Sequence, residues 1–253
     1  MTNIILSGAN GRMGRAISAK AAESKDFRIV AGYDINDFCE NDFPVYTDIE
    51  KCSEAADVIV DFSHPSAFSQ VLDFAKKRRL PLIVATTGLS AEQKQELFSA
   101  KSEIPVFYSA NMSLGVNLLI NLCKKTASVL GDKFDIEIVE KHHRTKLDAP
   151  SGTALAIADG ISEVLENTPQ YVYDRHSVRR ERSKNEIGIH SVRGGSIVGE
   201  HEVIFAGADE IISLAHSATS REVFASGALA AAGFMKDKPA GIYSMNELIG
   251  EMI

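Results

Sequence analysis

A glycine-rich turn close to the N-terminus constrains the fold more than any other feature of the chain. It reads Gly8-Ala9-Asn10-Gly11-Arg12-Met13-Gly14, follows a short apolar run and precedes a helix-like pattern. This context, with glycine at every third position, is typical of dinucleotide-binding turns. Gly8 would permit the tight turn, Gly11 would let the backbone approach a pyrophosphate, and Gly14 would let helix and strand pack closely. We therefore expect the residues from Gly8 to Met13 to bind a nucleotide cofactor.

An acidic residue lies at the position where dinucleotide-binding folds have a carboxylate that binds the adenosine ribose. Asp34 follows the apolar run 28–33 and lies 20 residues beyond Gly14. Its carboxylate can accept hydrogen bonds from the adenosine ribose, and it would repel a 2′-phosphate unless a cation compensated. Ile35 is apolar, and we expect Arg12, the one positive side chain of the turn, to serve the pyrophosphate or the adenine. NADH is therefore predicted to be preferred modestly, with NADPH still used.

The first part of the chain alternates short apolar runs with helix-like segments. Strands are expected over residues 3–7, 28–33, 58–62, 81–85 and 106–108, and helices over 12–24, 66–77 and 91–100. Such alternation is typical of βαβ units around a parallel sheet. We therefore predict an α/β fold in which about the first 110 residues form a Rossmann-like, doubly wound nucleotide domain.

The pattern changes after Asn111. A helix is expected over residues 114–130, a strand over 134–139, a helix over 152–165, a polar stretch over 167–185, and strands over 187–192, 197–205 and 210–215. Strands gathered late and joined by glycine-containing turns predict a mixed or antiparallel sheet with helices on one face. This would be a second domain of α+β type. An alanine-rich helix is expected from residue 221, with Pro239 and Gly241 stopping it.

Charge and composition narrow the classes of partner. The chain has 27 basic and 34 acidic residues, a net charge of -7, so no overall positive field favours nucleic acid or an anionic membrane. No apolar run has the length of a membrane span, and no signal-peptide pattern precedes the first strand. The three cysteines lie too far apart for a disulfide framework or a zinc knuckle. We therefore expect a cytoplasmic protein without nucleic-acid or membrane partners.

Motifs of competing enzyme classes are missing from the sequence. It contains neither the Gly-x4-Gly-Lys-Ser/Thr segment of a P-loop nor the His-Glu-x-x-His segment of a zinc enzyme. No tyrosine is followed four positions later by lysine, the pair expected from a short-chain dehydrogenase. The glycines of the first turn could simply form a turn. Their place after the first strand, the helix pattern behind them and Asp34 favour nucleotide binding instead.

The densest chemistry lies in residues 140–154, Glu-Lys-His-His-Arg-Thr-Lys-Leu-Asp-Ala-Pro-Ser-Gly-Thr-Ala. A cluster of charges often forms no more than a solvated loop. Here, however, Ser151, Gly152 and Thr153 open a predicted helix, whose first N–H groups would form a second anion site beside the basic side chains. That combination favours a substrate that carries carboxylates.

The histidines do not form a metal-binding pattern. His142 and His143 would point to opposite sides of an extended segment, and no cysteine or further histidine stands at a short ligand spacing. We therefore predict no metal. His190, His201 and His216 are isolated in the sequence and are expected to be structural.

With residues 140–154 the chain resembles the dihydrodipicolinate reductase family over nearly its whole length. Besides the glycine turn, the similar segments are Val60-Asp61-Phe62-Ser63, Ala85-Thr86-Thr87-Gly88, Ser109-Ala110-Asn111-Met112, Arg193-Gly194-Gly195 and Gly199-Glu200-His201. Residues 140–154 are highly specific to the family, whereas the glycine turn is not. The resemblance implies that further cofactor-binding residues are Phe62, Ala85, Thr86, Thr87, Ser109, Ala110, Asn111 and Met112.

The resemblance also implies an activity and a domain organisation. Members of the family reduce 4-hydroxy-tetrahydrodipicolinate, a small dicarboxylate, to tetrahydrodipicolinate with loss of water, in lysine and diaminopimelate biosynthesis. Residues 1–111 and 218–253 would form the dinucleotide-binding domain. Residues 112–217 would form the domain for substrate binding and for assembly into a homotetramer.

Roles for single residues follow from the same resemblance. His142 and Lys146 would be the proton-donating pair. Substrate carboxylates would be bound by His143, Ser151, Gly152 and Thr153. The sequence departs from the family at Ser217, where a basic residue is common, so this chain lacks a charge that its relatives commonly carry there.

Two other functions are compatible with the residues alone. One is another two-domain dehydrogenase that acts on an amino-acid-derived carbonyl compound. The other is a redox sensor that binds the nucleotide without catalysis. Residues 142–146 argue against the sensor, because a protein without catalytic activity needs no acid and cation near the nicotinamide.

Overall fold

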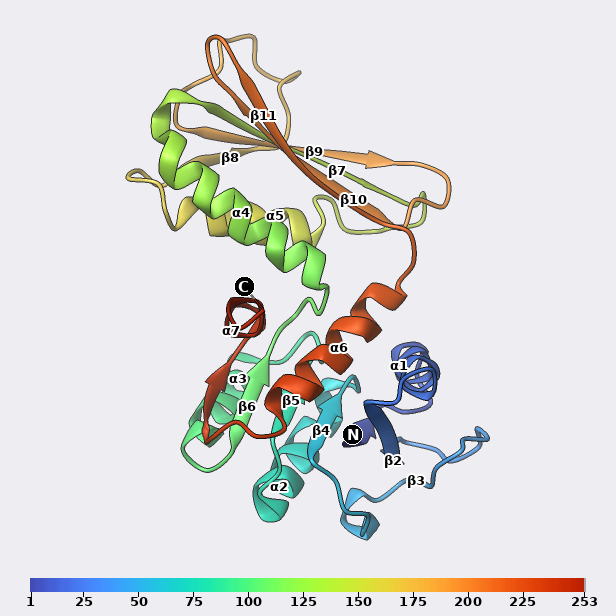
Figure 1. Cartoon of the computed structure of the whole chain (residues 1–253). Coiled ribbons are helices and arrows are strands. Elements are labelled where there is room, and N and C mark those ends of the chain that lie inside the picture. Colours follow the sequence, from blue (N-terminus) through green and yellow to red (C-terminus); the bar gives the residue numbers. More distant parts are fainter. Residues whose placement is uncertain (253) are drawn as a thin grey trace. The chain divides into compact units, whose positions relative to one another are not determined.

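Two separate β-sheets organise the chain, one with seven strands and one with five (Figure 1). The computed structural model describes residues 1–252. They divide into two units, one made of Met1–Leu114 with the segment that begins at Glu222, the other of Gly115–Arg221. Each sheet has its own helices; the first has an apolar core on each face, and the second has one core. The first unit is therefore discontinuous in sequence.

The sheet of the first unit is parallel throughout, in the order β12-β6-β5-β4-β1-β2-β3. Its strands are β1 (Thr2–Ser7), β2 (Phe27–Tyr33), β3 (Val45–Tyr46), β4 (Val58–Asp61), β5 (Leu82–Val84), β6 (Pro105–Tyr108) and β12 (Gly241–Tyr243). The strand order reverses at β1, which has β2 on one side and β4 on the other. In sheets of this kind, ligands bind outside the carboxyl ends of the strands at the point of reversal. The prediction of a Rossmann-like sheet is confirmed.

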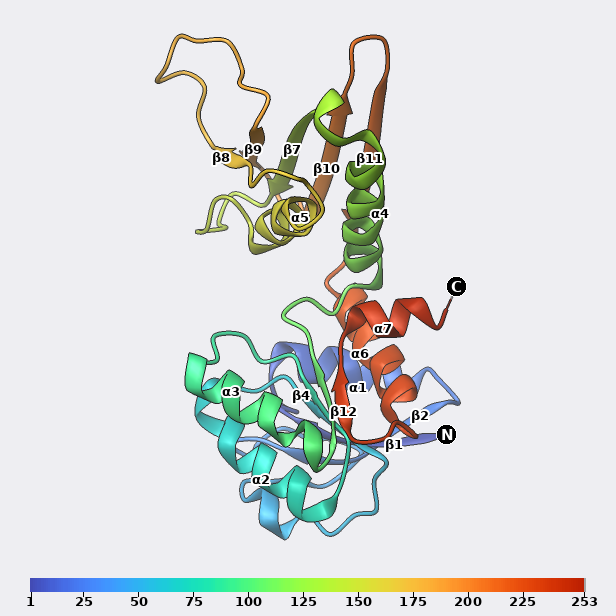
Figure 2. The ribbon, with the colours of Figure 1, turned by 90° about the vertical axis from the view of Figure 1, so that its left-hand side faces the viewer.

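Helices cover both faces of this sheet (Figure 2). They are α1 (Arg12–Ala22), α2 (Phe68–Arg78), α3 (Ala91–Ser99), α6 (Glu222–Met235) and α7 (Met245–Gly250). In β1, Ile4 and Leu6 pack into the core that includes α1 and α6, whereas Ile5 packs into the core that includes α2. Because successive strand residues point to opposite faces, a strand buried on both faces is apolar at every position. This explains the continuous apolar runs of the sequence.

Three short strands were not expected from the sequence. They are β3, β12 and, in the second unit, β8 (Gln170–Val172). Strands of two or three residues are too short to show the alternation on which a sequence prediction rests. The C-terminal segment therefore adds a strand and a second helix to the first unit. After α6 ends, β12 pairs with β6, and α7 follows.

The sheet of the second unit is mixed, and its helices lie on one face, as predicted. Its order is β11-β10-β7-β9-β8, where β7 is Asp135–His142, β9 is Glu186–Arg193, β10 is Gly199–Ala206 and β11 is Ile211–Ala218. Strand β10 is antiparallel to β11 and β7, whereas β7 is parallel to β9. Helices α4 (Leu114–Leu130) and α5 (Gly152–Ser162) pack against buried residues of the sheet such as Ile138 and Phe205.

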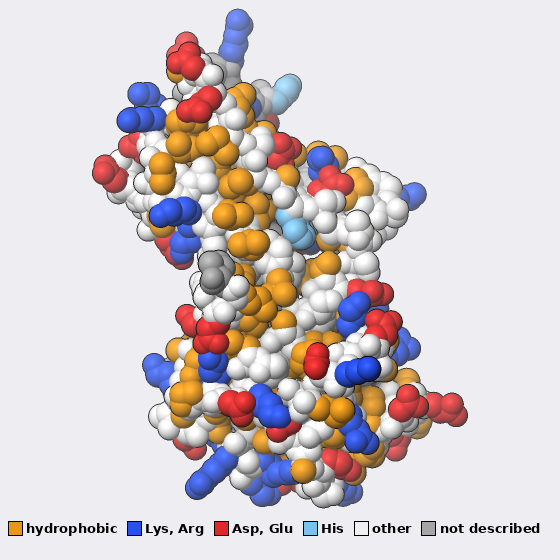
Figure 3. Space-filling view, in the orientation of Figure 1, with side chains coloured by type: hydrophobic (Ala, Val, Ile, Leu, Met, Phe, Trp, Pro, Cys, Tyr) orange, Lys and Arg blue, Asp and Glu red, His pale blue; other side chains and the backbone are white. Residues whose placement is uncertain are grey.

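The surface mixes charges of both signs. On the face drawn in Figure 3, acidic and basic side chains are interspersed, and apolar side chains gather over α4. Leu118, Leu122 and Val129 of that helix are exposed. That face therefore has no extended basic area of the kind that attracts nucleic acid. Across residues 1–252, no helix has both the length and the apolar character needed to cross a membrane.

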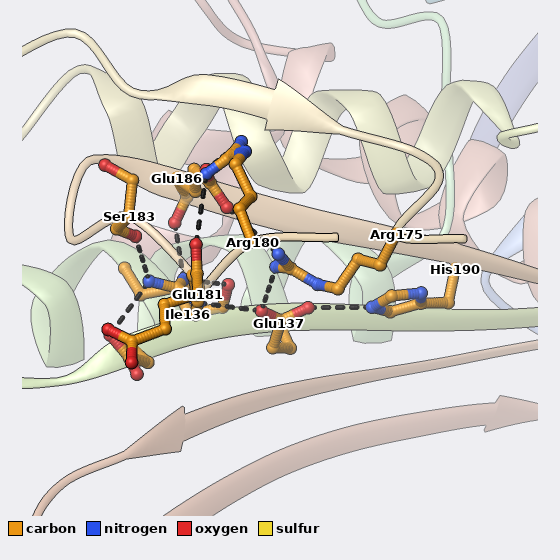
Figure 4. Close-up of polar contacts among 10 residues, drawn as sticks. Ile136, Glu137, Arg175, Arg180, Glu181, Ser183, Glu186 and His190 are labelled. Carbon is orange, nitrogen blue, oxygen red and sulfur yellow. Dashed lines mark hydrogen bonds and ion pairs between the residues drawn. The ribbon is translucent and has the colours of Figure 1, made fainter. Parts of the chain in front are cut away.

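On the face of the second sheet that the helices leave open, ion pairs hold the long segment between β8 and β9 (Figure 4). Glu137 of β7 accepts hydrogen bonds from Arg175 at 2.7 Å and from Arg182 at 2.9 Å, and its other oxygen lies 2.7 Å from Nε2 of His190. Burial would raise the pKa of Glu137, but hydrogen bonds from Arg182 and His190 hold that pKa below its ordinary value. A Cβ on Gly188 would lie 1.8 Å from this carboxylate, so the glycine makes room for it.

We predict that Arg182→Ala destabilises the second unit. Besides Glu137, the guanidinium bonds Asp135 and the backbone carbonyls of Ile136 and Glu186. Removing these hydrogen bonds should lower the free energy of unfolding by about 1–3 kcal/mol. Urea unfolding measures the change, with Arg179→Ala, an exposed arginine of the same segment, as the control. Equal midpoints for the two variants would contradict the prediction.

Candidate functional site

The glycine turn has the backbone geometry of a phosphate-binding turn. Gly8 has a φ of +79°, and a Cβ on it would lie 2.6 Å from the carbonyl oxygen of Phe62. A Cβ on Gly14 would lie 2.2 Å from the carbonyl oxygen of Gly8. Neither position accepts a side chain. Gly11 is the N-cap of α1 and has no side chain to occupy the first N–H groups, so these can bind an anion.

Asp34 is held next to this turn. Its Oδ2 accepts a hydrogen bond from the backbone N–H of Asn10 at 2.9 Å, and its Oδ1 accepts one from the N–H of Ile35 at 2.8 Å. The Asn10 side chain in turn donates to the carbonyl oxygen of Asn36 at 2.7 Å. Arg12, the first residue of α1, is exposed. The acid that the sequence predicts for ribose thus lies against the predicted phosphate turn.

The remaining candidate cofactor residues follow the carboxyl ends of β4, β5 and β6. Asp61, the last residue of β4, is fully buried and accepts hydrogen bonds from Ser63 Oγ at 2.6 Å and from Thr86 Oγ1 at 2.7 Å. This carboxylate therefore ties the loop that contains Phe62 to the loop of residues 85–87. Because the strands are parallel, their carboxyl ends share one edge of the sheet with the glycine turn. In the sequence, Asp61 is only part of a segment that resembles the family.

In the second unit, residues 140–154 run from the end of β7 to the start of α5. His142 ends β7, and its Nδ1 lies 2.6 Å from Oε2 of Glu140. Glu140 is fully buried and also accepts hydrogen bonds from the N–H of Ser151 at 3.1 Å and from Arg193, twice, at 2.8 Å. Burial would raise the pKa of Glu140, but hydrogen bonds from Arg193, Ser191 and His142 lower it to about 2. Glu140 is therefore a carboxylate at neutral pH.

The start of α5 is capped on one side and open on another. Ser151 is the N-cap, and its Oγ accepts a hydrogen bond from the N–H of Ala154 at 3.1 Å. A Cβ on Gly152 would meet no atom within 4 Å. Space for an anionic group is therefore present beside Gly152, at the start of the helix, where N–H groups can bind an anion.

Lys146 and His143 lie on the loop between β7 and α5. The Nζ of Lys146 donates to Asp148 Oδ1 at 2.8 Å, and its backbone N–H donates to the carbonyl oxygen of His143 at 3.1 Å. The Nδ1 of His143 lies 2.8 Å from Thr145 Oγ1, and its Nε2 lies 3.5 Å from Nη2 of Arg221. Lys146 and His143 thus lie on the loop that leads into the start of α5.

The structure adds residues that the sequence did not identify as parts of this cluster. In the register of the sheet, Glu140 pairs with His201 of β10 and with Ser191 of β9, and His201 pairs with His216 of β11. His201 is isolated in the sequence, but the fold brings it to Glu140 and Ser151. Its Nε2 lies 3.0 Å from Ser151 Oγ, and its ring stands edge-on to that of His142, 5.3 Å between centroids.

Burial also determines the charge of His201. It lowers the pKa of His201 to about 4, so the ring is neutral at neutral pH. In the sequence, Arg193 is only part of a segment similar to the family, although it bonds both oxygens of Glu140. No sequence signal links these residues, because Arg193 and Glu140 are 53 positions apart. Among residues 1–252, no three histidine, cysteine or acidic side chains are grouped to hold a metal ion.

Comparison with solved structures supports the fold. A dipicolinate-bound dihydrodipicolinate reductase from Paenisporosarcina sp. TG-14 superposes with a TM-score of 0.83 at 24% sequence identity, covering 97% of this chain and 99% of the other. A myo-inositol dehydrogenase from Corynebacterium glutamicum has a TM-score of 0.59 at 16% identity, covering 95% and 90%. Dehydrogenases with different named substrates therefore share this architecture, and fold alone does not choose between them.

Sequence comparison is more specific. The chain is 53% identical to the 4-hydroxy-tetrahydrodipicolinate reductase of Caldanaerobacter subterraneus subsp. tengcongensis, over 98% of each chain. It is 48% identical to the protein of the same name from Clostridium tetani, over 97% of this chain and 96% of that protein. Two family models match it: dihydrodipicolinate reductase, N-terminus, over residues 2–112, and dihydrodipicolinate reductase, C-terminus, over residues 115–249. The chain therefore belongs to the dihydrodipicolinate reductase family of oxidoreductases.

Proposed function

We propose that the chain is an NAD(P)H-dependent reductase that converts 4-hydroxy-tetrahydrodipicolinate to tetrahydrodipicolinate with loss of water, in lysine and diaminopimelate biosynthesis. The observation that carries the proposal is the cluster at residues 140–154. It combines a histidine held by a buried carboxylate, a lysine and an open helix start. A redox sensor that only binds a nucleotide would need none of these. The names of the relatives support the same reaction.

The two halves of the reaction belong to different parts of the chain. Residues 1–111 and 218–253 would bind the nucleotide, whose dihydronicotinamide supplies the hydride. Residues 112–217 would bind the substrate and assemble the oligomer. The phosphates would lie on the N–H groups at the start of α1, in the cradle that Gly8 and Gly14 leave free of side chains. Asp34 would accept hydrogen bonds from the adenosine ribose, and residues 62, 85–87 and 109–112 would complete the cofactor site.

Substrate carboxylates would bind at the start of α5. The N–H groups of Gly152 and Thr153 would bind one of them, with His143 supplying a further donor and Ser151 holding the helix start in place. Hydride addition to the ring carbon left electron-poor by loss of water produces an enamine-like carbon that needs a proton. His142 and Lys146 would stabilise the negative charge that develops on the ring and would deliver the proton.

A homotetramer in the cytoplasm is also proposed. The face of the second sheet that α4 and α5 leave open has exposed apolar side chains, including Val192 and Ile211. Such a face can be covered by a second copy of the chain. Sedimentation equilibrium of the purified protein tests the assembly.

We predict that His142→Ala and Lys146→Ala each lose turnover by about 10²–10⁴ while the protein still folds, because a positioned proton donor contributes a factor of this size. Oxidation of NADH, followed at 340 nm with the coupled aldehyde–pyruvate condensation product, measures the loss. Lys133→Ala, an exposed lysine just before β7, is the matched control. Near-normal turnover in both variants would overturn the assignment, and no turnover by the wild type would favour the sensor.

Gly152→Val should raise the Michaelis constant for the substrate tenfold or more, about 1.4 kcal/mol of lost binding. The added side chain enters open space in the protein, so folding should be normal, but it would crowd a carboxylate at the helix start. Thr153→Ala keeps the backbone N–H and should have a mild effect. An unchanged Michaelis constant in Gly152→Val would contradict an anion site there.

Cofactor choice gives a further prediction. Repulsion between Asp34 and a partly exposed 2′-phosphate is about 1 kcal/mol, a several-fold effect on affinity. The ratio of turnover to Michaelis constant should therefore favour NADH modestly, and Asp34→Ala should shift it toward NADPH. A clear NADPH preference of the wild type would mean that a cation reaches the 2′-phosphate. Arg12→Ala identifies that cation, because it would then weaken NADPH alone.

A further inference from the structure

The imidazole of His142 is held by its surroundings on several sides. Glu140 contacts Nδ1 at 2.6 Å, and the ring of His201 stands edge-on at 5.3 Å. Gly199 of β10 lies at the opposite ring nitrogen, where a Cβ would be 3.1 Å from Nε2. The ring is buried, yet it has a carboxylate at one nitrogen and a position without a side chain at the other.

The charge of Glu140 decides which nitrogen carries the proton. An ionised carboxylate can only accept hydrogen bonds, so Nδ1 of His142 must donate. The pKa of Glu140, lowered to about 2, keeps the carboxylate ionised at every pH at which the protein would work. The donor role of Nδ1 is thus the same in the neutral and in the charged imidazole. Only Nε2 can then gain or lose a proton.

Arg193 keeps that carboxylate in one orientation. Its two terminal nitrogens bond the two oxygens of Glu140 at 2.8 Å each, a geometry that a lysine could not reproduce. Arg193 also donates to the carbonyl oxygen of Asp148 at 2.7 Å, on the loop that contains Lys146. One guanidinium therefore contacts both the partner of His142 and the loop of the second proposed proton donor.

We propose that Glu140, held by Arg193, is a positioning residue that keeps the proton of His142 on Nδ1 and leaves Nε2 as the atom that exchanges a proton with the substrate. That Nε2 exchanges a proton with the substrate rests on the proposed function. The position of the proton on Nδ1 depends only on the contacts among Glu140, Arg193 and His142.

The test compares two glutamates of the same strand. Glu140→Gln removes the charge beside His142. Glu137→Gln makes the same change on the opposite face of β7, where the carboxylate contacts His190 at 2.7 Å. Glu140→Gln should lower turnover by about 10–10³-fold, because misplaced tautomers and lost supporting hydrogen bonds have costs in this range. Its Michaelis constant should stay within about threefold of the wild type, since a glutamine oxygen can still accept the hydrogen bond from the N–H of Ser151 at the proposed carboxylate site. Glu137→Gln should change neither constant.

A spectroscopic measurement separates positioning from a merely structural role. Nitrogen-15 spectra of histidine-labelled protein distinguish the two neutral tautomers, and His142→Ala assigns the signal. The wild type and Glu137→Gln should show the proton on Nδ1, and Glu140→Gln should show a mixture or the Nε2 form. A wild-type proton on Nε2 would overturn the proposal, as would an unchanged tautomer in Glu140→Gln.

The outcomes also separate this inference from the proposed function. If His142→Ala keeps turnover but the tautomers behave as expected, the assignment of His142 as proton donor fails and the positioning by Glu140 stands. If His142→Ala loses turnover but Glu140→Gln keeps both its turnover and the Nδ1 proton, the positioning fails and the catalytic assignment stands.

Discussion

The proposed catalytic end of the second unit depends on a carboxylate that water does not reach. Burying an ionised group costs several kcal/mol unless other groups replace its hydration. For Glu140 the replacement comes from Arg193, from the N–H of Ser151 and from His142. These partners belong to β9, to the start of α5 and to β7 itself. The bonds that offset the cost of burial therefore also join three elements and orient the histidine.

In the first unit, backbone geometry rather than a buried ion pair forms the proposed phosphate site. Gly8 and Gly14 allow approaches that any Cβ would prevent, and they bring the N–H groups of α1 to the carboxyl edge of the parallel sheet. Such a site does not depend on a basic surface, which is consistent with a chain of net charge -7. The buried carboxylate of Asp61 then joins the loops after β4 and β5 at the same edge.

Much of the fold was predictable because its signals are local. The helix expected over residues 114–130 has these bounds in α4, and the turn at Gly8 has the strand, the helix and the acid that its spacing predicts. Continuous apolar runs indicate strands that are buried on both faces, and the sequence Ser-Gly-Thr indicates the start of α5. Short strands such as β12 were missed, because a partner strand distant in sequence, rather than an internal pattern, makes them strands.

The sequence by itself determined the nucleotide turn, the acid that follows it, the parallel sheet and the segment of residues 140–154, all of which are patterns within a few neighbouring residues. Only the tertiary structure decided that Glu140 lies between His201 and Ser191 and is bonded by Arg193. The reason is strand register. A shift of one residue would turn every side chain of a strand to the other face, and register is set by packing between segments far apart in the chain.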